Sequence, residues 1–143
     1  MLISTKGRYA LCILVDMAEH QTDGYLPLKE IAERQEISEK YLESIIKTLV
    51  KSSVVVAMRG KGGGYRLNRP PEEINVGDVL EIAEDSLSPV SCLETDRFPC
   101  PRMARCRTLD FWRGLDATIR AYIHRFTVAD FTKPNQSGDD YVI

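Results

Sequence analysis

The stretch LKEIAERQEISEKYLESIIKTLVKSSVVVAMRGKGGGYRLNRP, residues 28–70, decides the fold. Its first half holds two apolar patterns of helical period, with a turn expected near Ile37. Ser38 is a good N-cap for the second pattern, whose apolar residues recur at i, i+3, i+4, i+7 and i+8. These residues are Leu42, Ile45, Ile46, Leu49 and Val50. Two short helices joined by a tight turn indicate a helix-turn-helix, although an ordinary helical hairpin fits this half equally well.

The second half of the stretch adds a β-hairpin. Side chains alternate over 54–58 as in a strand, and a second extended run follows a glycine-rich turn at 60–64. Arg59, Lys61 and Arg66 surround that turn. A phosphate-binding loop would lead from a strand into a helix, whereas this turn leads into an extended stretch that ends at two prolines. A basic hairpin directly after a helix-turn-helix predicts a wing, which can approach the DNA backbone closely.

Helical patterns flank this stretch on both sides. A first helix is expected over residues 5–20, capped by Ser4 or Thr5, and another begins at Asn75 or Gly77.

A last helical pattern runs from about residue 102 to residue 126, with apolar residues spaced 3, 4, 3 and 4, as in the seam of a packed helix pair. They are Trp112, Leu115, Ile119, Tyr122 and Phe126. These residues could pack against their own domain, but pairing with a second copy is favoured because the chain offers little other core to a long helix.

The fold class predicted from these elements is mainly α with a small β-hairpin. The 143 residues divide into a winged helix-turn-helix domain over 1–85, a cysteine loop over 86–106, a dimerisation helix over 107–131 and a mobile tail over 132–143.

Charge and composition narrow the function. Residues 1–70 carry 11 Lys+Arg against 8 Asp+Glu, whereas residues 71–143 carry 8 against 13, so the front half suits a polyanionic partner. No apolar run is long enough to span a membrane, and we expect a cytoplasmic protein with no membrane partner. Two scattered histidines offer no acid–base or nucleophile–base constellation, which argues against an enzyme.

Three of the four cysteines lie in SCLETDRFPCPRMARC, residues 91–106, at Cys92, Cys100 and Cys106. In a reducing compartment, clustered thiols bind metal or sense oxidants more often than they form disulfides. Three thiolates repel one another unless a cation lies among them, and an iron–sulfur cluster prefers cysteine ligands. Nearby arginines are expected to lower the thiol pKa values. They are Arg97, Arg102, Arg105 and Arg107. A metal-free thiol switch and a zinc site remain alternatives, although structural zinc sites usually use more closely spaced pairs.

Four motifs occur in one order: STKGRYAL at 4–11, EIAERQEISEKYLE at 30–43, RGKGGGYRL at 59–67, and the cysteine loop before an FW pair. Over about residues 1–126 the chain resembles the Rrf-two family of winged-helix transcription regulators, and within it the IscR-type iron–sulfur regulators. The resemblance implies a homodimer that binds a double-stranded DNA operator. It also implies a [2Fe-2S] or [4Fe-4S] cluster, held in each subunit by Cys92, Cys100 and Cys106, that adjusts this binding.

The resemblance further implies a DNA-binding surface built from three segments. The recognition helix would contribute Ser38, Lys40, Tyr41 and Glu43; the wing Arg59, Lys61, Gly62 and Gly63; and the first helix Lys6, Arg8 and Tyr9. Glu43 is the most informative, because a carboxylate in the major groove accepts a hydrogen bond from cytosine N4 and otherwise repels phosphate. We expect Glu43 to discriminate among sequences rather than to add affinity.

The chain departs from the family at the fourth cluster ligand. IscR-type proteins place a histidine where this chain has Leu109, and a nitric-oxide-sensing branch places an acidic residue where it has Arg8. Asp110, four residues after Cys106 and so expected on the same helical face, is one candidate. Cys12, from the first helix of a partner, is another, although a cysteine in an apolar stripe is more often a core residue. Glu94 and Asp96 also lie inside the loop.

A homodimeric DNA-binding transcription regulator, modulated by an iron–sulfur cluster and sensing redox change or nitric oxide, is therefore the favoured function. A metal-free thiol-based repressor of the same fold is the first alternative. An iron–sulfur electron carrier is the second, but it would have no use for a basic wing.

Overall fold

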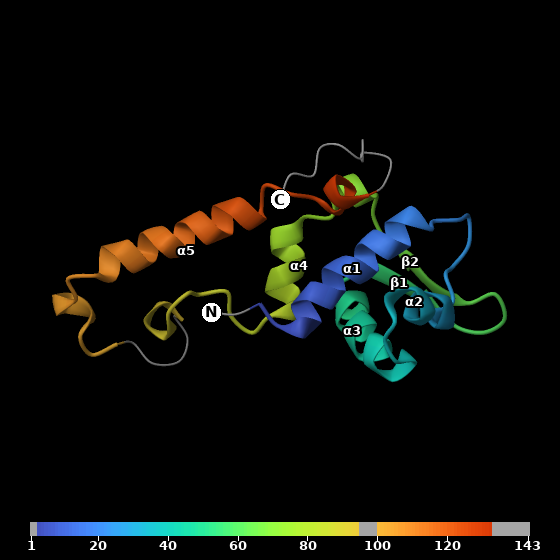
Figure 1. Cartoon of the computed structure of the whole chain (residues 1–143), viewed down its shortest axis with the longest axis horizontal. Coiled ribbons are helices and arrows are strands. Elements are labelled where there is room, and N and C mark those ends of the chain that lie inside the picture. The colour runs from blue at the N-terminus through green and yellow to red at the C-terminus, as the bar shows by residue number, and fades with distance from the viewer. Residues whose placement is uncertain (1–2, 95–99, 133–143) are drawn as a thin grey trace.

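The computed structural model describes residues 3–94 and 100–132, which form five α-helices, one antiparallel hairpin and four 3₁₀ helices. The α-helices are α1 (Thr5–Glu19), α2 (Leu28–Gln35), α3 (Glu39–Lys51), α4 (Val76–Ala83) and α5 (Leu109–Ile123). The strands are β1 (Val55–Met58) and β2 (Gly64–Leu67), and the 3₁₀ helices are η1 (Pro71–Glu73), η2 (Ser91–Leu93), η3 (Met103–Arg105) and η4 (Val128–Phe131). Figure 1 shows α1, α2, α3 and the hairpin in one body, α4 beside it, and α5 extending away. The predicted fold class is confirmed. No helix in these ranges could cross a membrane.

The helix-turn-helix consists of α2 and α3. The C-cap of α2 is Glu36, which adopts a left-handed conformation (φ 55°, ψ 41°) at a cost of about 1–2 kcal/mol. Two residues later, the Ser38 hydroxyl accepts a hydrogen bond from the Tyr41 N–H at 3.1 Å and begins α3, as the sequence predicts. These two caps set the tight turn between the helices.

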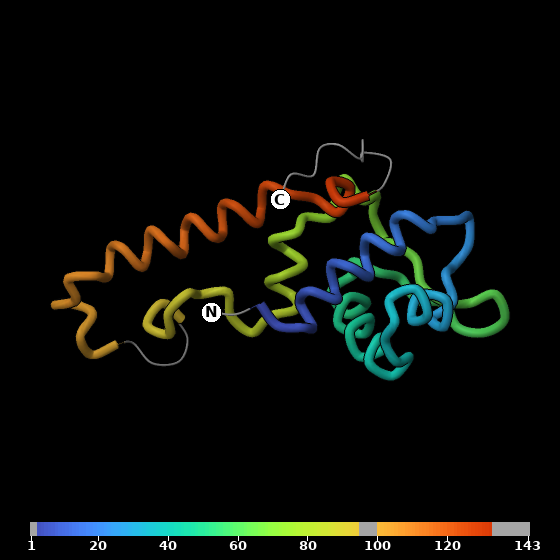
Figure 2. The backbone as a smooth tube through the Cα atoms, viewed as in Figure 1, coloured from blue at the N-terminus to red at the C-terminus, as the bar shows by residue number. Residues whose placement is uncertain are grey.

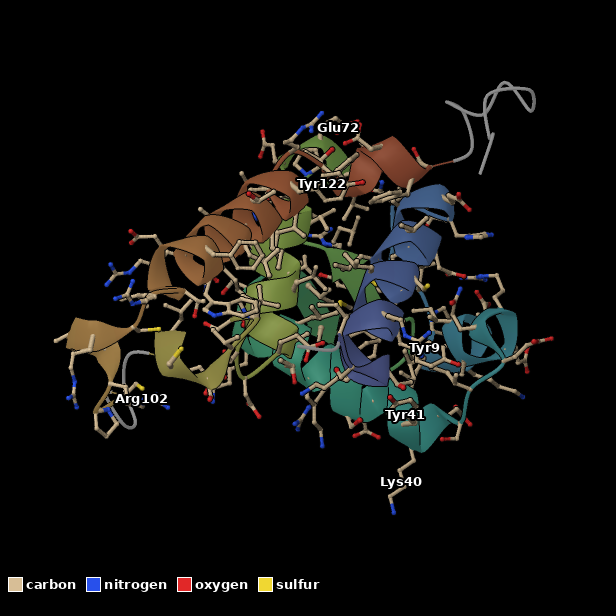
Figure 3. The ribbon with its side chains drawn as sticks, turned by 60° about the vertical axis from the view of Figure 1, so that its left-hand side comes forward. Tyr9, Lys40, Tyr41, Glu72, Arg102 and Tyr122 are labelled. Carbon is tan, nitrogen blue, oxygen red and sulfur yellow. The ribbon has the colours of Figure 1, made fainter. Side chains whose placement is uncertain are left out.

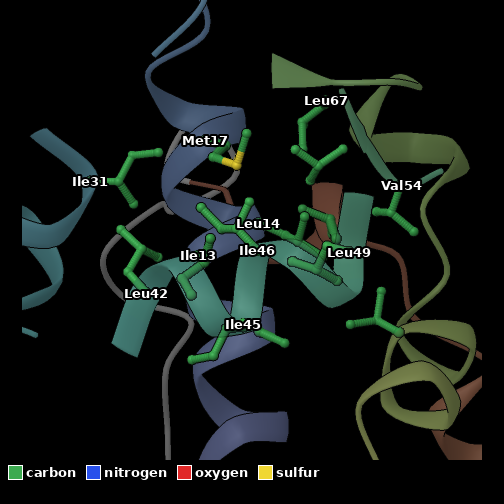
Figure 4. Packing of buried hydrophobic residues seen from close by; sticks show 14 of the residues in the cluster. Ile13, Leu14, Met17, Ile31, Leu42, Ile45, Ile46, Leu49, Val54 and Leu67 are labelled. Atoms are coloured by element: carbon green, nitrogen blue, oxygen red, sulfur yellow. The ribbon is translucent and has the colours of Figure 1, made fainter. Parts of the chain in front are cut away.

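The main core lies where α1, α3 and the hairpin meet (Figure 4). The predicted stripe of α3 faces inward, and four of its five residues are at most 1% exposed, whereas Val50 is half-buried. The four are Leu42, Ile45, Ile46 and Leu49, and α1 meets them with Ile13, Leu14 and Met17, all fully buried. Burial of each such side chain stabilises the fold by about 1.5–3 kcal/mol, so α3 is fixed by one face and its other face is free for solvent or a ligand.

A buried ion pair joins α1 to α2. Asp16 is 5% exposed, and its carboxylate accepts hydrogen bonds from Arg34 Nε at 2.9 and 3.0 Å and from Arg34 Nη2 at 2.7 Å. Gln35 Nε2 donates a further bond to Asp16 at 3.0 Å. The hydrogen bond to Asp16 raises the pKa of the Arg34 guanidinium above its usual value. The pair therefore holds the first helix of the helix-turn-helix against α1.

The wing is anchored through β2, which pairs with β1 on one edge and with Leu26 on the other. β1 and β2 pair in antiparallel register, with Val55 opposite Leu67. Tyr65 of β2 also exchanges two backbone hydrogen bonds of 2.8 Å with Leu26. Gly64 has φ 150°, and a Cβ there would clash with the Leu26 carbonyl, so glycine is required at this crossing.

The crossing of α1 and α4 explains the glycine of the first motif. A Cβ at Gly7 would clash with the Glu84 carboxylate. That carboxylate accepts hydrogen bonds from both the N–H and the hydroxyl of Ser4, each at 2.8 Å. Ser4 also caps α1 through the Gly7 N–H, so the start of α1 is fixed to the end of α4.

The C-terminal helix starts later than the sequence predicts. A helical pattern was expected from about residue 102, but α5 begins at Leu109. Before it come η3 and Cys106, whose extended backbone (φ −76°, ψ 114°) cannot continue a helix. The 3₁₀ turn and the extended Cys106 therefore delay the start of the helix to Leu109.

The helix also ends earlier than expected, at Ile123, with His124 as its C-cap. Phe126 thus lies beyond α5, and its assignment to the same helical seam is wrong. It packs against an apolar cluster of Val76, Leu80 and Leu87 in its own chain.

After α5 the chain turns back and pairs with the segment before α4 (Figure 2). The Val76 N–H donates to the Phe126 carbonyl at 3.0 Å, and the Val128 N–H to the Ile74 carbonyl at 2.9 Å. Asn75 caps α4 and donates its amide N–H to the His124 carbonyl at 2.9 Å. The C-terminal end of α5, which we call its base, is therefore attached to the winged domain. The rest of the helix projects away from that domain.

Candidate nucleic-acid interface and cysteine loop

The outer face of α3 carries the predicted recognition residues. Lys40 is exposed and points away from the body, and Tyr41 lies beside Tyr9 of α1 (Figure 3). The Ser38 hydroxyl is already used as the N-cap, so any DNA contact would come from its free lone pair or its proton. Glu43 is half-exposed, and its Oε1 lies 3.4 Å from Lys47 Nζ.

A groove between α3 and the wing gathers more basic groups than the sequence interpretation assigned. Glu43, Lys47, Lys51 and Arg59 all line it, together with backbone from the wing glycines. Lys47 and Lys51 were not predicted as site residues. Their positions four and eight residues after Glu43 place all three on one helical face, and this spacing could have revealed them.

The wing tip presents Arg59, Lys61 and Gly62 to solvent. Gly62 has φ 77° with open space around it, whereas a Cβ at Gly63 would meet the Met58 and Gly60 carbonyls. The turn therefore needs glycine at these positions. Its exposed surface consists of backbone N–H groups and the Arg59 and Lys61 side chains, which can contact phosphates.

The first helix joins this surface through aromatic packing. The rings of Tyr9 and Tyr41 meet edge to face, with centroids 5.8 Å apart and planes at 83°. Lys6 is half-buried and Arg8 is exposed, one turn from the Tyr9 contact. The structure therefore brings the predicted α1 segment to the start of the recognition helix.

The three loop cysteines are half-buried free thiols: Cys92 in η2, Cys100 before the turn, and Cys106 just before α5. Their sulfur atoms do not all lie within 4.8 Å of one another in the described ranges. Residues 95–99, including Arg97, lie outside those ranges. The donor set has the chemistry of a cluster site, and the loop would have to bring the sulfurs together around one.

Cys106 is hydrogen-bonded to the start of α5. Its sulfur lies 3.5 Å from the Thr108 hydroxyl, and Trp112 Nε1 donates to that same hydroxyl at 3.2 Å. Because the Thr108 oxygen accepts the hydrogen bond from Trp112, the Thr108 hydroxyl can donate its own proton to the Cys106 sulfur. This hydrogen bond is the main cause that lowers the pKa of the Cys106 thiol; the charge of Arg102 contributes least. The expected lowering of a thiol pKa by an arginine is therefore confirmed for Arg102 at Cys106, but it is the smallest of the causes.

The two candidate fourth ligands are both exposed. The expected burial of Cys12 is wrong: it faces outward on α1, in an apolar hollow bordered by Leu11, Val15 and Phe131. The helical argument for Asp110 also fails, because Cys106 is not in α5. The Asp110 side chain is 99% exposed, with a 3.9 Å ion pair to Arg113.

Most of α5 is uncovered within the chain. Phe111 is 65% exposed, Tyr122 57% and Leu115 36%, while Trp112 and Ile119 are half-buried. Leu109 is the one buried residue of this helix.

A helix-turn-helix followed by a basic wing, with an appended helix, defines the class of winged-helix DNA-binding transcription regulators. The sequence matches the Rrf2 family, described as iron-dependent transcriptional regulators, over residues 3–134, and the chain belongs to that family.

Curated relatives agree with this assignment. The chain is 36% identical over 136 residues to the HTH-type transcriptional regulator IscR of Aliivibrio salmonicida, covering 95% of this chain and 80% of that one. It is 37% identical over 130 residues to IscR of Serratia proteamaculans, covering 91% and 78%. These relatives are regulators, not enzymes.

Solved structures give the same fold. CymR, the global cysteine regulator of B. subtilis, has a TM-score of 0.74 and 32% identity, covering 95% of this chain and 99% of that one. IscR of T. potens has a TM-score of 0.72 and 33% identity, covering 100% and 94%.

Proposed function

We propose that this regulator is a homodimer whose operator binding is set by an iron–sulfur cluster held by Cys92, Cys100 and Cys106. The observation that carries this proposal is the hydrogen-bonded path from Cys106 through Thr108 to Trp112. It connects a cluster ligand directly to the exposed face of α5. Any event that moves the Cys106 sulfur would also act on the helix that pairs the subunits.

Pairing through α5 would cover the apolar surface that this chain leaves exposed. Phe111, Leu115 and Tyr122 present a contiguous length of helix to solvent, which is unusual for a monomer. A second copy would bury them in a symmetric contact, with Trp112 and Ile119 at its edge. Phe126 is left out of this interface, since it packs in its own domain.

On DNA, α3 would enter the major groove and the wing would follow the backbone. Glu43 would read cytosine, held in place by Lys47, while Lys40 and Tyr41 flank it. Arg59 and Lys61, with the N–H groups near Gly62 and Gly63, would contact phosphates, as would Lys6 and Arg8. Lys47 and Lys51 add two cations to the same groove.

The fourth ligand fits Cys12 better than Asp110. Cys12 is an exposed free thiol, and apolar side chains of Leu11, Val15 and Phe131 border the hollow in which it lies. If the second copy supplies it, the cluster would bridge the two subunits, and its loss would change their relative position. When bound, the cluster would supply a redox centre that oxidants or nitric oxide can destroy. Such thiol ligation requires a reducing compartment, the cytoplasm.

The test begins with protein purified anaerobically and reconstituted with iron and sulfide. Duplex DNA selected from a random library by this protein serves as the ligand, and affinity is measured by fluorescence anisotropy at fixed salt. We expect cluster removal to change the dissociation constant at least about tenfold, a coupling of about 1.4 kcal/mol. The Cys92→Ser/Cys100→Ser/Cys106→Ser variant should bind equally well before and after reconstitution. Equal affinity of the loaded and stripped wild type would refute cluster control.

A metal-free thiol switch is the second candidate, favoured by the lowered pKa of Cys106. The structural neighbours also include CymR of Staphylococcus aureus in an oxidized form, with a TM-score of 0.66 and 29% identity. Iron and sulfide assays separate the two. A colourless protein that changes affinity on peroxide treatment, with a mass increase at Cys106, would establish the switch; one zinc per chain would indicate a zinc site instead.

A further inference from the structure

A second group of metal-ligating side chains lies far from the cysteine loop, where the base of α5 meets α4. Asp78 and Glu81 occupy successive turns of α4, and His124 is the C-cap of α5. Their ligand atoms all lie within 4.8 Å of one another. The three come from segments more than forty residues apart, so the fold brings them together.

The His124 ring occupies the space that a side chain at position 77 would fill, so its placement depends on Gly77. A Cβ at that position would clash with three atoms of the imidazole. The ring can therefore lie flat against α4, and this contact brings its edge to the Asp78 and Glu81 carboxylates.

The hydrogen bonding of His124 fixes which nitrogen faces the carboxylates. Nδ1 lies 2.7 Å from the Arg120 carbonyl, which can only accept, so Nδ1 carries a proton. Nε2 then lies 3.4 Å from Asp78 Oδ1 and 3.6 Å from Glu81 Oε1. An unprotonated Nε2 would aim a lone pair at two anions, which is unfavourable unless a cation lies between the three groups.

We propose that Asp78, Glu81 and His124 form a divalent metal site that ties α5 to the winged domain. Ligand atoms about 2.1 Å from one tetrahedral ion lie about 3.4 Å apart, close to the two N···O separations seen here. The bond from Nδ1–H to a backbone carbonyl is the usual way a ligating histidine is oriented. One imidazole and two carboxylates suit Mn²⁺, Fe²⁺ or Zn²⁺.

Arg120 already brings a positive charge to this group of side chains. Its Nη1 lies 3.4 Å from Glu81 Oε1, and its Nε lies 3.2 Å from Asp116. Asp116 therefore shares the guanidinium charge, and within the described residues the Arg120 side chain pairs with Glu81 and Asp116 but not with Asp78. Arg120 can keep its ion pair with Asp116 when the Glu81 carboxylate binds a metal ion.

The site is independent of the proposed cluster, and Mn²⁺ tests it separately because this hard ion avoids thiolate ligands. The full chain is titrated with Mn²⁺, and the loss of the free-ion electron paramagnetic resonance signal measures binding. We expect one ion per chain, with at least about tenfold weaker binding in His124→Gln and in Glu81→Gln. Glu72→Gln, an exposed acid on η1, is the matched control and should bind as the wild type does.

A thermal melt gives a second measurement that does not depend on variants. Saturating Mn²⁺ should raise the unfolding midpoint of the wild type, because the ion binds only where both segments are in place. No saturable binding, or equal binding by His124→Gln and the wild type, would overturn the site. In that case a proton on Nε2 would be the cation that the two carboxylates hold.

Discussion

Replacement of Arg34 by methionine tests whether the ion pair with Asp16 holds α2 in place. Methionine keeps most of the aliphatic stem, so the change removes mainly the charge and the hydrogen bonds. The Asp16 side chain, 4% exposed, would lose all three bonds from Arg34. A broken buried pair costs about 3–5 kcal/mol, because the remaining charge is left without a partner or water.

Two neighbours place the expected cost near the lower end of that range. Gln35 still donates to Asp16 at 3.0 Å, and His20 Nδ1 lies 3.7 Å from the same carboxylate. We therefore expect Arg34→Met to lose about 3 kcal/mol, a large share of a typical total of about 5–15 kcal/mol. Because Arg34 is 30% exposed, the penalty should arise mainly from the stranded carboxylate and not from the lost cation.

The assay is urea unfolding followed by far-ultraviolet circular dichroism at one protein concentration, which must be fixed if the chain dimerises. Arg113→Met is the matched control, since its pair with Asp110 is exposed and 3.9 Å long and should contribute less than about 1 kcal/mol. Asp16→Leu/Arg34→Met should be more stable than Arg34→Met alone, because no buried charge remains. Equal effects of Arg34→Met and Arg113→Met would refute the reasoning.

Three further predictions concern DNA binding and the cysteine loop. Glu43→Ala should keep or strengthen affinity while broadening the range of sequences bound, measured on a panel of selected duplexes; equal weakening on all of them would contradict a discriminating role. Lys61→Ala should reduce the slope of log affinity against log salt by about one unit, whatever the sequence; an unchanged slope would remove Lys61 from the phosphate contacts. Thr108→Val removes the donor that stabilises the Cys106 thiolate, so alkylation of Cys106 in the metal-free protein should require higher pH; an unchanged pH profile would assign the lowered pKa to another cause.

The winged domain could be predicted from the sequence because its signals are local. The Ser38 cap, the α3 stripe and the glycine-rich turn each specify their own backbone, and the tertiary structure agrees with all three. The prediction failed where a tertiary contact overrides the local apolar pattern. The apolar spacing continues to Phe126, but the segment that turns back after α5 brings this residue into contact with the α4 cluster.

The candidate site was less predictable, because its members are joined by contacts across the chain. Cys12 occupies an apolar pattern, yet α3 covers the neighbouring stripe of α1 and leaves Cys12 outside. Lys47 belongs to the binding groove only because the wing folds beside it. The spacing within α3 places Lys47 on the face of Glu43, but it does not predict which neighbouring element buries or approaches that face.

The position of α5 links the separate observations. Its first turn is joined to the cysteine loop through Thr108, whereas its last residue is joined to α4 through Asn75 and the His124 carbonyl. Apart from these ends the helix is largely uncovered. A change at the loop can therefore move the free end of α5 while its base stays fixed to the winged domain. In a dimer paired along α5, such a movement would alter the separation of the two α3 helices, and hence the fit to half-sites about 34 Å apart on DNA.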